Sequence, residues 1–162
     1  MELRGNAFWV VILTFLVAFL LAVVPFPEWA MNYRPQWVVM VLIYWGMALP
    51  YRVGIGFAWV AGLLMDIMEG SMLGLNALAF AIIAYITLSL HQRLRMFSSV
   101  QQSGVVLALI GLYLMMTHWM KVAADQAVNT NLLFLLGALS SAFIWPWLFL
   151  LLRQMRRGFS VR

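Results

Sequence analysis

Asp66 is the ionisable side chain placed deepest inside an apolar stretch of this 162-residue chain. It follows Arg52 by fourteen residues, and a helical rise of about 1.5 Å per residue puts it about 21 Å farther along. A membrane hydrocarbon core of about 30 Å still encloses that position. A carboxylate there is costly unless it is paired, protonated or facing water. Asp66 is therefore the first candidate for a functional site.

Arg34 is the predicted partner of Asp66. It precedes Arg52 by eighteen residues, which on a neighbouring antiparallel helix leaves a vertical gap of about 6 Å to Asp66. A snorkelling Arg side chain can cover that gap. The ion pair would tie the second apolar segment to the third, either as a purely structural contact or as a binding or coupling site. Rival partners at the same end are Glu28, Glu69 and Lys121.

Small residues recur every four positions around Asp66 and form a small-residue stripe. Its members are Gly54, Ala58, Gly62, Gly70 and Gly74. Four residues advance a helix by about 400°, so neighbouring members lie nearly above one another, and three or four of them can share one contact. Small residues at this spacing let another helix approach closely. The stripe is either ordinary internal packing or a groove for a partner's helix.

The sequence contains no recognisable catalytic or metal-binding motif. The chain has no cysteine and two isolated histidines, which gives no metal-ligand cluster. There is no Gly-rich phosphate loop and no HExxH motif. We therefore expect no enzymatic activity, no metal and no cofactor. An intramembrane hydrolase would need a second catalytic group beside Asp66, and the sequence offers none.

The elements that must position these residues are apolar helices. Hydrophobic residues make up 65% of the chain and charged residues 9%, whereas a soluble domain carries about 25% charged residues. The net charge of +5 comes from Lys and Arg spread along ends and connections, which fits membrane topology better than nucleic-acid binding. We expect an all-α integral membrane protein with a single transmembrane domain over residues 1–162.

Polar residues and prolines divide the chain into six apolar segments. The first is too long for a cleavable signal peptide, so we expect an uncleaved spanning helix. The second and third look short, because a core of about 30 Å needs about 20 residues. Either flanking polar residues extend these helices, or the two form a re-entrant hairpin. The segments are 7–24, 36–49, 53–68, 72–90, 103–120 and 132–152, with polar connections between them, the longest at 91–102 and 121–131.

The Lys and Arg residues predict the orientation. Six spans place both termini on one side, and eight basic residues fall on that side against two on the other. Cytoplasmic loops carry the excess of positive charge, so both termini are expected in the cytoplasm.

Trp145-Pro146-Trp147 lies midway along the last segment. A proline inside a helix removes a backbone hydrogen bond and kinks it. The two tryptophans are expected to pack at the bend.

Several of these motifs together resemble a known family. Taken in order and spacing, they are similar to the rod shape-determining membrane protein family MreD, most closely in the form found in Gram-negative rod-shaped bacteria. The clear resemblance covers residues 34–90 and the last helix. The motifs are Arg34-Pro35-Gln36-Trp37, Tyr44-Trp45, the run from Ala48 to Gly54, the Asp-x-x-x-Gly-x-x-x-Gly pattern of Asp66 to Gly74, and Trp145-Pro146-Trp147.

The resemblance implies a non-enzymatic scaffold subunit in the bacterial inner membrane, within the cell-elongation machinery that builds side-wall peptidoglycan. It implies direct binding to MreC and, in the same complex, MreB, RodA and a penicillin-binding transpeptidase. It further implies a fold similar to the six-helix substrate-binding subunit of energy-coupling-factor transporters, surrounded by membrane lipids. A small-molecule or lipid-binding subunit of a transporter is the alternative. The oligomeric state stays open. Positions expected to matter are Arg34, Pro35, Asp66, Gly70 and Gly74.

Overall fold

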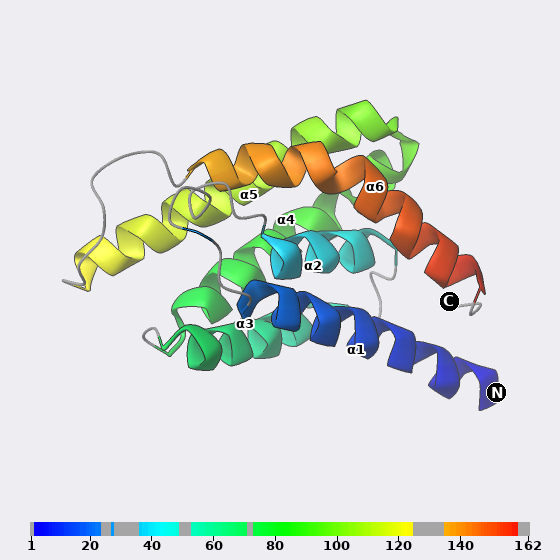
Figure 1. Ribbon diagram of the computed structural model, residues 1–162, viewed down its shortest axis with the longest axis horizontal. Coiled ribbons are helices and arrows are strands. Elements are labelled where there is room, and N and C mark those ends of the chain that lie inside the picture. Colours follow the sequence, from blue (N-terminus) through cyan, green and yellow to red (C-terminus); the bar gives the residue numbers. More distant parts are fainter. Residues whose placement is uncertain are drawn as a thin grey trace.

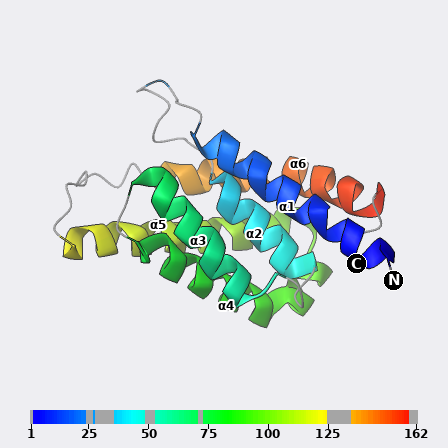
Figure 2. The same cartoon turned by 90° about the horizontal axis from the view of Figure 1, so that it is seen from below.

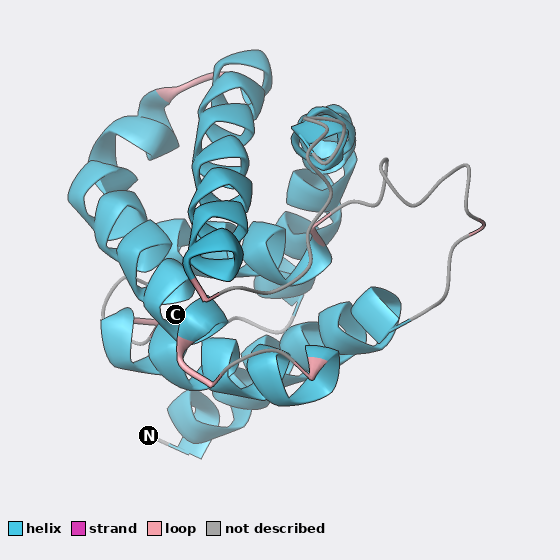
Figure 3. Cartoon of the chain, turned by 90° about the vertical axis from the view of Figure 1, so that its left-hand side faces the viewer, coloured by secondary structure: helices cyan, strands magenta, loops and turns pink. Residues whose placement is uncertain are grey.

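The protein is an all-α bundle, as the sequence predicts. The computed structural model describes residues 2–23, 27, 36–48, 53–70, 73–124 and 135–158. Within these ranges there are helices and short turns but no strand (Figure 3). The helices are α1 (Glu2–Val23), α2 (Trp37–Ala48), α3 (Ile55–Glu69), α4 (Leu75–Met96), α5 (Ser99–Ala123) and α6 (Leu136–Gly158), arranged side by side in Figure 1.

Three helices are long and apolar enough to cross a membrane: Leu75–Met96, Val100–Ala123 and Leu136–Met155. Shorter apolar helices cover Trp9–Val23, Trp37–Ala48 and Ile55–Met68. The outer faces carry large exposed apolar side chains, such as Leu20 at 61% and Phe143 at 72% exposure. A water-soluble monomer rarely exposes such continuous apolar surface, so this surface is suited to lipid.

The short second helix is the buried centre of the bundle. Eleven of the twelve residues of α2 are buried, and the helix packs against α1, α4, α5 and α6. At about 1.5 Å per residue it is about 18 Å long, well short of a hydrocarbon core. A helix that is apolar on all sides belongs in an interior, which explains why this segment needs no polar face.

Side chains from other helices cap both ends of α2. At its start, the hydroxyl of Ser141 on α6 accepts a hydrogen bond from the backbone N–H of Gln36, at 2.9 Å. At its end, the guanidinium of Arg95 on α4 donates to the carbonyls of Met47 and Ala48, both at 2.9 Å. Helix ends leave backbone groups without partners inside the helix, so these contacts let α2 end within the protein.

The expected extension of the short helices is wrong at their N-terminal ends. Gln36 lies outside α2, and α3 begins only after Gly54, so neither helix extends toward its N-terminal side as expected. At its other end α3 does include a polar residue, Glu69. The interior position of α2 makes the extra length unnecessary.

The polar connection expected at residues 91–102 is also wrong, because α4 and α5 continue through most of it. The break is confined to Phe97 and Ser98. Ser98 accepts from the N–H of Gln101, and the side chain of Gln101 accepts from the N–H of Ser98. This reciprocal capping box starts α5 and makes a long polar loop unnecessary.

The sixth helix changes direction near its middle (Figure 1), and Pro146 lies inside it. Trp145 is 1% exposed, and its Nε1 donates to Oε1 of Gln102 at 3.4 Å. Trp147 points outward at 58% exposure and contacts the ring of Phe143. Only one of the two tryptophans therefore packs inward at the proline.

Both ends of the described chain lie at the same end of the bundle as one of the turns. The beginning of α1 and the end of α6 lie at the same end of the molecule (Figure 1). The turn between α4 and α5, which follows Arg93 and Arg95, lies at that end too, whereas the α3–α4 turn lies at the other (Figure 2).

Arg95→Gln should destabilise the protein because it leaves two carbonyls at the end of α2 without donors. Bonds to a charged group contribute about 1.5–3 kcal/mol, so we expect the free energy of unfolding to fall by about that much. Thermal unfolding in detergent micelles would measure it. Arg153→Gln on α6 is the matched control, since the structure gives Arg153 no hydrogen bond within the described ranges. Equal stability of the two variants would rule out the cap.

Candidate functional site

Asp66 lies in the last turn of α3 and is 0% exposed. It points at the beginning of α4, not at lipid. Its Oδ2 accepts a hydrogen bond from the backbone N–H of Gly74, and its Oδ1 accepts from that of Asn76, both at 2.9 Å. One carboxylate thus takes two of the donors that the first turn of α4 cannot satisfy internally.

This contact is a helix cap supplied by a different helix. Gly74, the N-cap residue of α4, has no side chain to supply a cap. A negative group is favourable at a helix N-terminus because the backbone dipoles leave partial positive charge there. Asp66 therefore supplies the acceptor that α4 lacks, and the N-terminus of α4 offsets the cost of burying a carboxylate.

Two glycines let the chain double back between α3 and α4. Gly70 ends α3 with φ +69°, and Gly74 starts α4 with φ +99°. Residues with a Cβ rarely adopt this left-handed region. The Asp-x-x-x-Gly-x-x-x-Gly pattern thus encodes one acceptor and two turn positions, which together form the α3–α4 corner.

A polar chain extends from the corner to the fifth helix. The hydroxyl of Tyr113 donates to Oδ1 of Asn76 at 2.6 Å, and both side chains are buried. The ring of Tyr113 also contacts Phe80, with 5.5 Å between centroids. Asn76 therefore joins Asp66 on α3 to Tyr113 on α5 through its backbone N–H and its side-chain oxygen.

Gly62 sits one turn before Asp66, where α3 and α4 are in backbone contact. A Cβ at this position would lie 2.3 Å from Cα of Ala77 and 2.6 Å from the carbonyl oxygen of Asn76. These atoms are backbone and cannot rotate away. The absence of a side chain at residue 62 is what brings α4 close enough for Asp66 to reach its first N–H groups.

The small-residue stripe divides into two parts. Ala58 and Gly62 are buried within the protein. Gly54 precedes α3 and has open space where a Cβ would lie, as do Gly70 and Gly74 at the corner. Whether any of these positions meets a partner helix stays a prediction.

Arg34 and Pro35 lie outside the described residues, so the Arg34–Asp66 ion pair also stays a prediction. Within the described ranges, no three His, Asp or Glu side chains gather where they could hold a metal ion. The partners of Asp66 among the described residues include the backbone N–H groups of Gly74 and Asn76. The chemistry of the corner, as described, is structural.

Sequence reasoning did not single out the polar residues that cross-link the helices. Asn76, Tyr113, Gln102 and Ser141 are all buried and hydrogen-bonded. On α1, Thr14 accepts from Nε1 of Trp45 at 2.8 Å. The available signal was a polar residue isolated in an apolar run, which inside a membrane points inward and finds a partner.

Gly62→Ala should prevent the close approach of α3 and α4. Alanine is a better helix former than glycine by about 1 kcal/mol, so the same change at an open position should stabilise the protein slightly. Gly56 on α3 is exposed with open space around its Cβ position, and Gly56→Ala is the control. Thermal unfolding in detergent should show a loss for Gly62→Ala and no loss for Gly56→Ala; the same sign for both would contradict the close contact.

Asp66→Ala should cost about 2 kcal/mol or more of unfolding free energy, since it removes the acceptor of one buried and one part-buried N–H group. Tyr113→Phe keeps the ring contact with Phe80 and removes one hydroxyl bond, so we expect about 1 kcal/mol. Chemical denaturation in mild detergent compares the two. If Asp66→Ala were the milder change, the carboxylate would not be the main support of the corner.

The family model described as rod shape-determining protein MreD matches residues 4–155 of this chain. The curated rod shape-determining protein MreD of Haemophilus influenzae is 35% identical over 158 residues, which covers 97% of this chain and 97% of that protein. No solved structure matches the chain significantly, so the similarity to transporter substrate-binding subunits stays a prediction. Since both matches span nearly the whole sequence, including the α3–α4 corner, the chain belongs to the MreD family.

Proposed function

We propose that this chain is a non-enzymatic scaffold subunit that helps to determine rod shape, and that it acts by holding MreC in the inner membrane. The observation that carries the proposal is the family match over residues 4–155. A non-enzymatic role is also supported by the hydrogen bonds of the polar side chains, which hold the protein's own helices together. The described bonds of Asp66, Arg95 and Ser141 join helices of the same chain.

The proposed location is the bacterial inner membrane, with several spans and both termini in the cytoplasm. Three helices long enough to span support a membrane location. Arg93 and Arg95 end α4 at the same end of the bundle as the termini (Figure 1). Basic residues concentrate on the cytoplasmic side.

The proposed contact surface for MreC is the outside of the α3–α4 corner. Ile67, Met68 and Leu73 expose 66%, 42% and 66% of their surface there, beside the exposed Gly70. The corner lies at the end of the bundle opposite to the termini (Figure 1). In the proposed orientation this end faces the periplasm, where the large part of MreC lies in this family.

The buried half of the small-residue stripe is not part of that surface. Gly62 is covered by the backbone of Ala77, so a partner helix cannot reach it without displacing α4. The corner is rigid by comparison with a loop, because Asp66 fixes both of its helices. A fixed turn carrying exposed apolar side chains is suited to hold one partner in a set orientation. MreB, RodA and a penicillin-binding transpeptidase would be reached through MreC.

The test is crosslinked affinity purification of the full-length protein from native membranes, with mass spectrometry of the recovered proteins. A single-span protein with a large periplasmic part, together with cell-wall synthases, would support the proposal. An ATPase pair with a transmembrane coupling subunit would overturn it in favour of a transporter.

A photoreactive amino acid at Leu73 should crosslink to MreC in these membranes. Leu139 is the matched control, because it is 54% exposed on α6 near the same end. We expect crosslinking at Leu73 at least several times that at Leu139. Equal crosslinking at both positions, with MreC recovered, would retain the scaffold function and reject the corner as its contact surface.

A further inference from the structure

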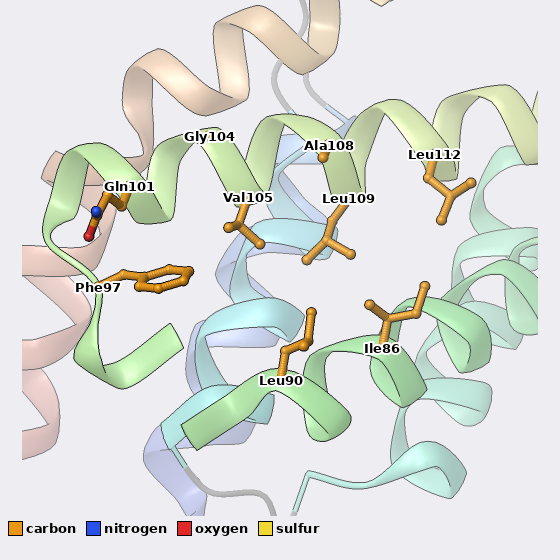
Figure 4. A pocket seen from close by; sticks show the side chains of 9 residues that line it. All are labelled: Ile86, Leu90, Phe97, Gln101, Gly104, Val105, Ala108, Leu109 and Leu112. Atoms are coloured by element: carbon orange, nitrogen blue, oxygen red, sulfur yellow. The ribbon is translucent and has the colours of Figure 1, made fainter. Parts of the chain in front are cut away.

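A groove between α4 and α5 is a feature of the fold that the corner and the proposed scaffold role leave unexplained. It has a volume of about 520 Å³, within the range of about 300–1,000 Å³ typical of small-molecule sites. Its walls are apolar apart from Gln101. Figure 4 shows Phe97 and Gln101 at one end of the groove and Ile86 and Leu112 at the other, with Leu90, Val105 and Leu109 between them.

The length of the groove matches one leaflet of a membrane. Both of its helices are long and apolar enough to span, so a groove between them runs in the spanning direction. Gln101 and Leu112 lie eleven residues apart on α5, about 16 Å at 1.5 Å per residue. Half of a hydrocarbon core of about 30 Å is about 15 Å. One end therefore lies at the membrane surface and the other near the midplane.

Helical spacing puts a cation, Arg93, next to the end of the groove at which Phe97 and Gln101 lie. Arg93 lies three residues after Leu90 and seven after Ile86, so it continues the same face of α4 by one turn. It is exposed and makes no hydrogen bond within the described part of the chain. Arg95 is different, since its guanidinium is already bound to the end of α2.

A second polar group faces the same end. The side-chain oxygen of Gln101 accepts the N–H of Ser98, and its Nε2 has no acceptor among the residues described. The surface end of the groove thus offers a guanidinium and an amide donor above a strictly apolar channel. This combination complements a phosphate attached to a hydrocarbon tail.

We propose that the α4–α5 groove binds one acyl chain of an anionic phospholipid whose phosphate is held by Arg93 and Gln101. The distribution of polarity favours a lipid over a partner helix. A spanning partner would need a seam through both leaflets, whereas this groove ends near the midplane, at Ile86 and Leu112. Its single charged end also matches a molecule with one charged head.

The site can be filled without disturbing the fold. Gly104 lines the groove, and a Cβ built there meets nothing within 4 Å, so Gly104→Leu projects into the channel. Gly56→Leu on α3 is the matched control, since Gly56 is also exposed, has equally open space and does not line the groove. Both variants should unfold at a midpoint no lower than that of the wild type in detergent.

Native mass spectrometry of the delipidated, full-length protein, titrated with phosphatidylglycerol or phosphatidylethanolamine, is the test. We expect one phosphatidylglycerol to be retained after annular lipids are stripped, and Gly104→Leu to weaken it at least tenfold while Gly56→Leu does not. Arg93→Gln should lower the preference for phosphatidylglycerol about fivefold, the effect of one basic residue near an anionic headgroup. The proposal would be overturned if Gly104→Leu and Gly56→Leu retained the lipid equally. It would also be overturned if the wild type bound phosphatidylglycerol and phosphatidylethanolamine equally well.

A photoreactive amino acid at Ala108, on the groove wall, gives a second readout that does not depend on the Gly104→Leu substitution. In native membranes it should become attached to phospholipid. Attachment to a polypeptide in place of lipid would also overturn the proposal, and would identify the groove as a protein interface.

Discussion

Every helix end that lies inside this bundle has backbone groups that neither water nor lipid can satisfy. The protein resolves this constraint with side chains from neighbouring helices. Asp66 of α3 caps the start of α4, Ser141 of α6 caps the start of α2, and Arg95 of α4 caps its end. These contacts make a twelve-residue helix tenable as the centre of a membrane bundle. Asp66 and Ser141 are polar residues within apolar segments, and both are buried where they make these contacts.

The capping of α4 by Asp66 depends on a close approach of α3 and α4. Asp66 reaches the first N–H groups of α4 because Gly62, one turn earlier, allows the two helix backbones to meet at Ala77. Gly70 and Gly74 then supply the positive φ angles that return the chain over so short a distance. The glycines and the aspartate are thus one device, in which the glycines set the separation and the carboxylate fixes the orientation. Without the glycines Asp66 could not reach α4, and without Asp66 the close approach of the two helices would leave the start of α4 uncapped.

The helical class, the main apolar segments and the position of Asp66 inside an apolar helix could be predicted from the sequence, because hydrophobicity and the cost of a charge in lipid are local properties. The partners of Asp66 could not. Two of them are backbone groups of Gly74 and Asn76, which carry no signature in residue type. The role of Arg95 was hidden for a related reason: counted as a charge it reports topology, whereas its bonds go to carbonyls of α2, a helix remote in sequence. The ends of α4 and α5 were misplaced because a polar helix turn and a polar loop have similar composition.

The prediction of an ion pair with Arg34 rested on the premise that a buried carboxylate needs a cation. The ion pair stays a prediction, but two N–H groups at a helix N-terminus already compensate part of the burial. A cation would then add to a group that is largely satisfied, and its contribution would be smaller than that of a cation facing an isolated charge. This distinction bears on function. A carboxylate held by its own helices keeps the corner in place whether or not a partner is bound, so the surface outside the corner is preorganised for binding and pays little ordering entropy on association.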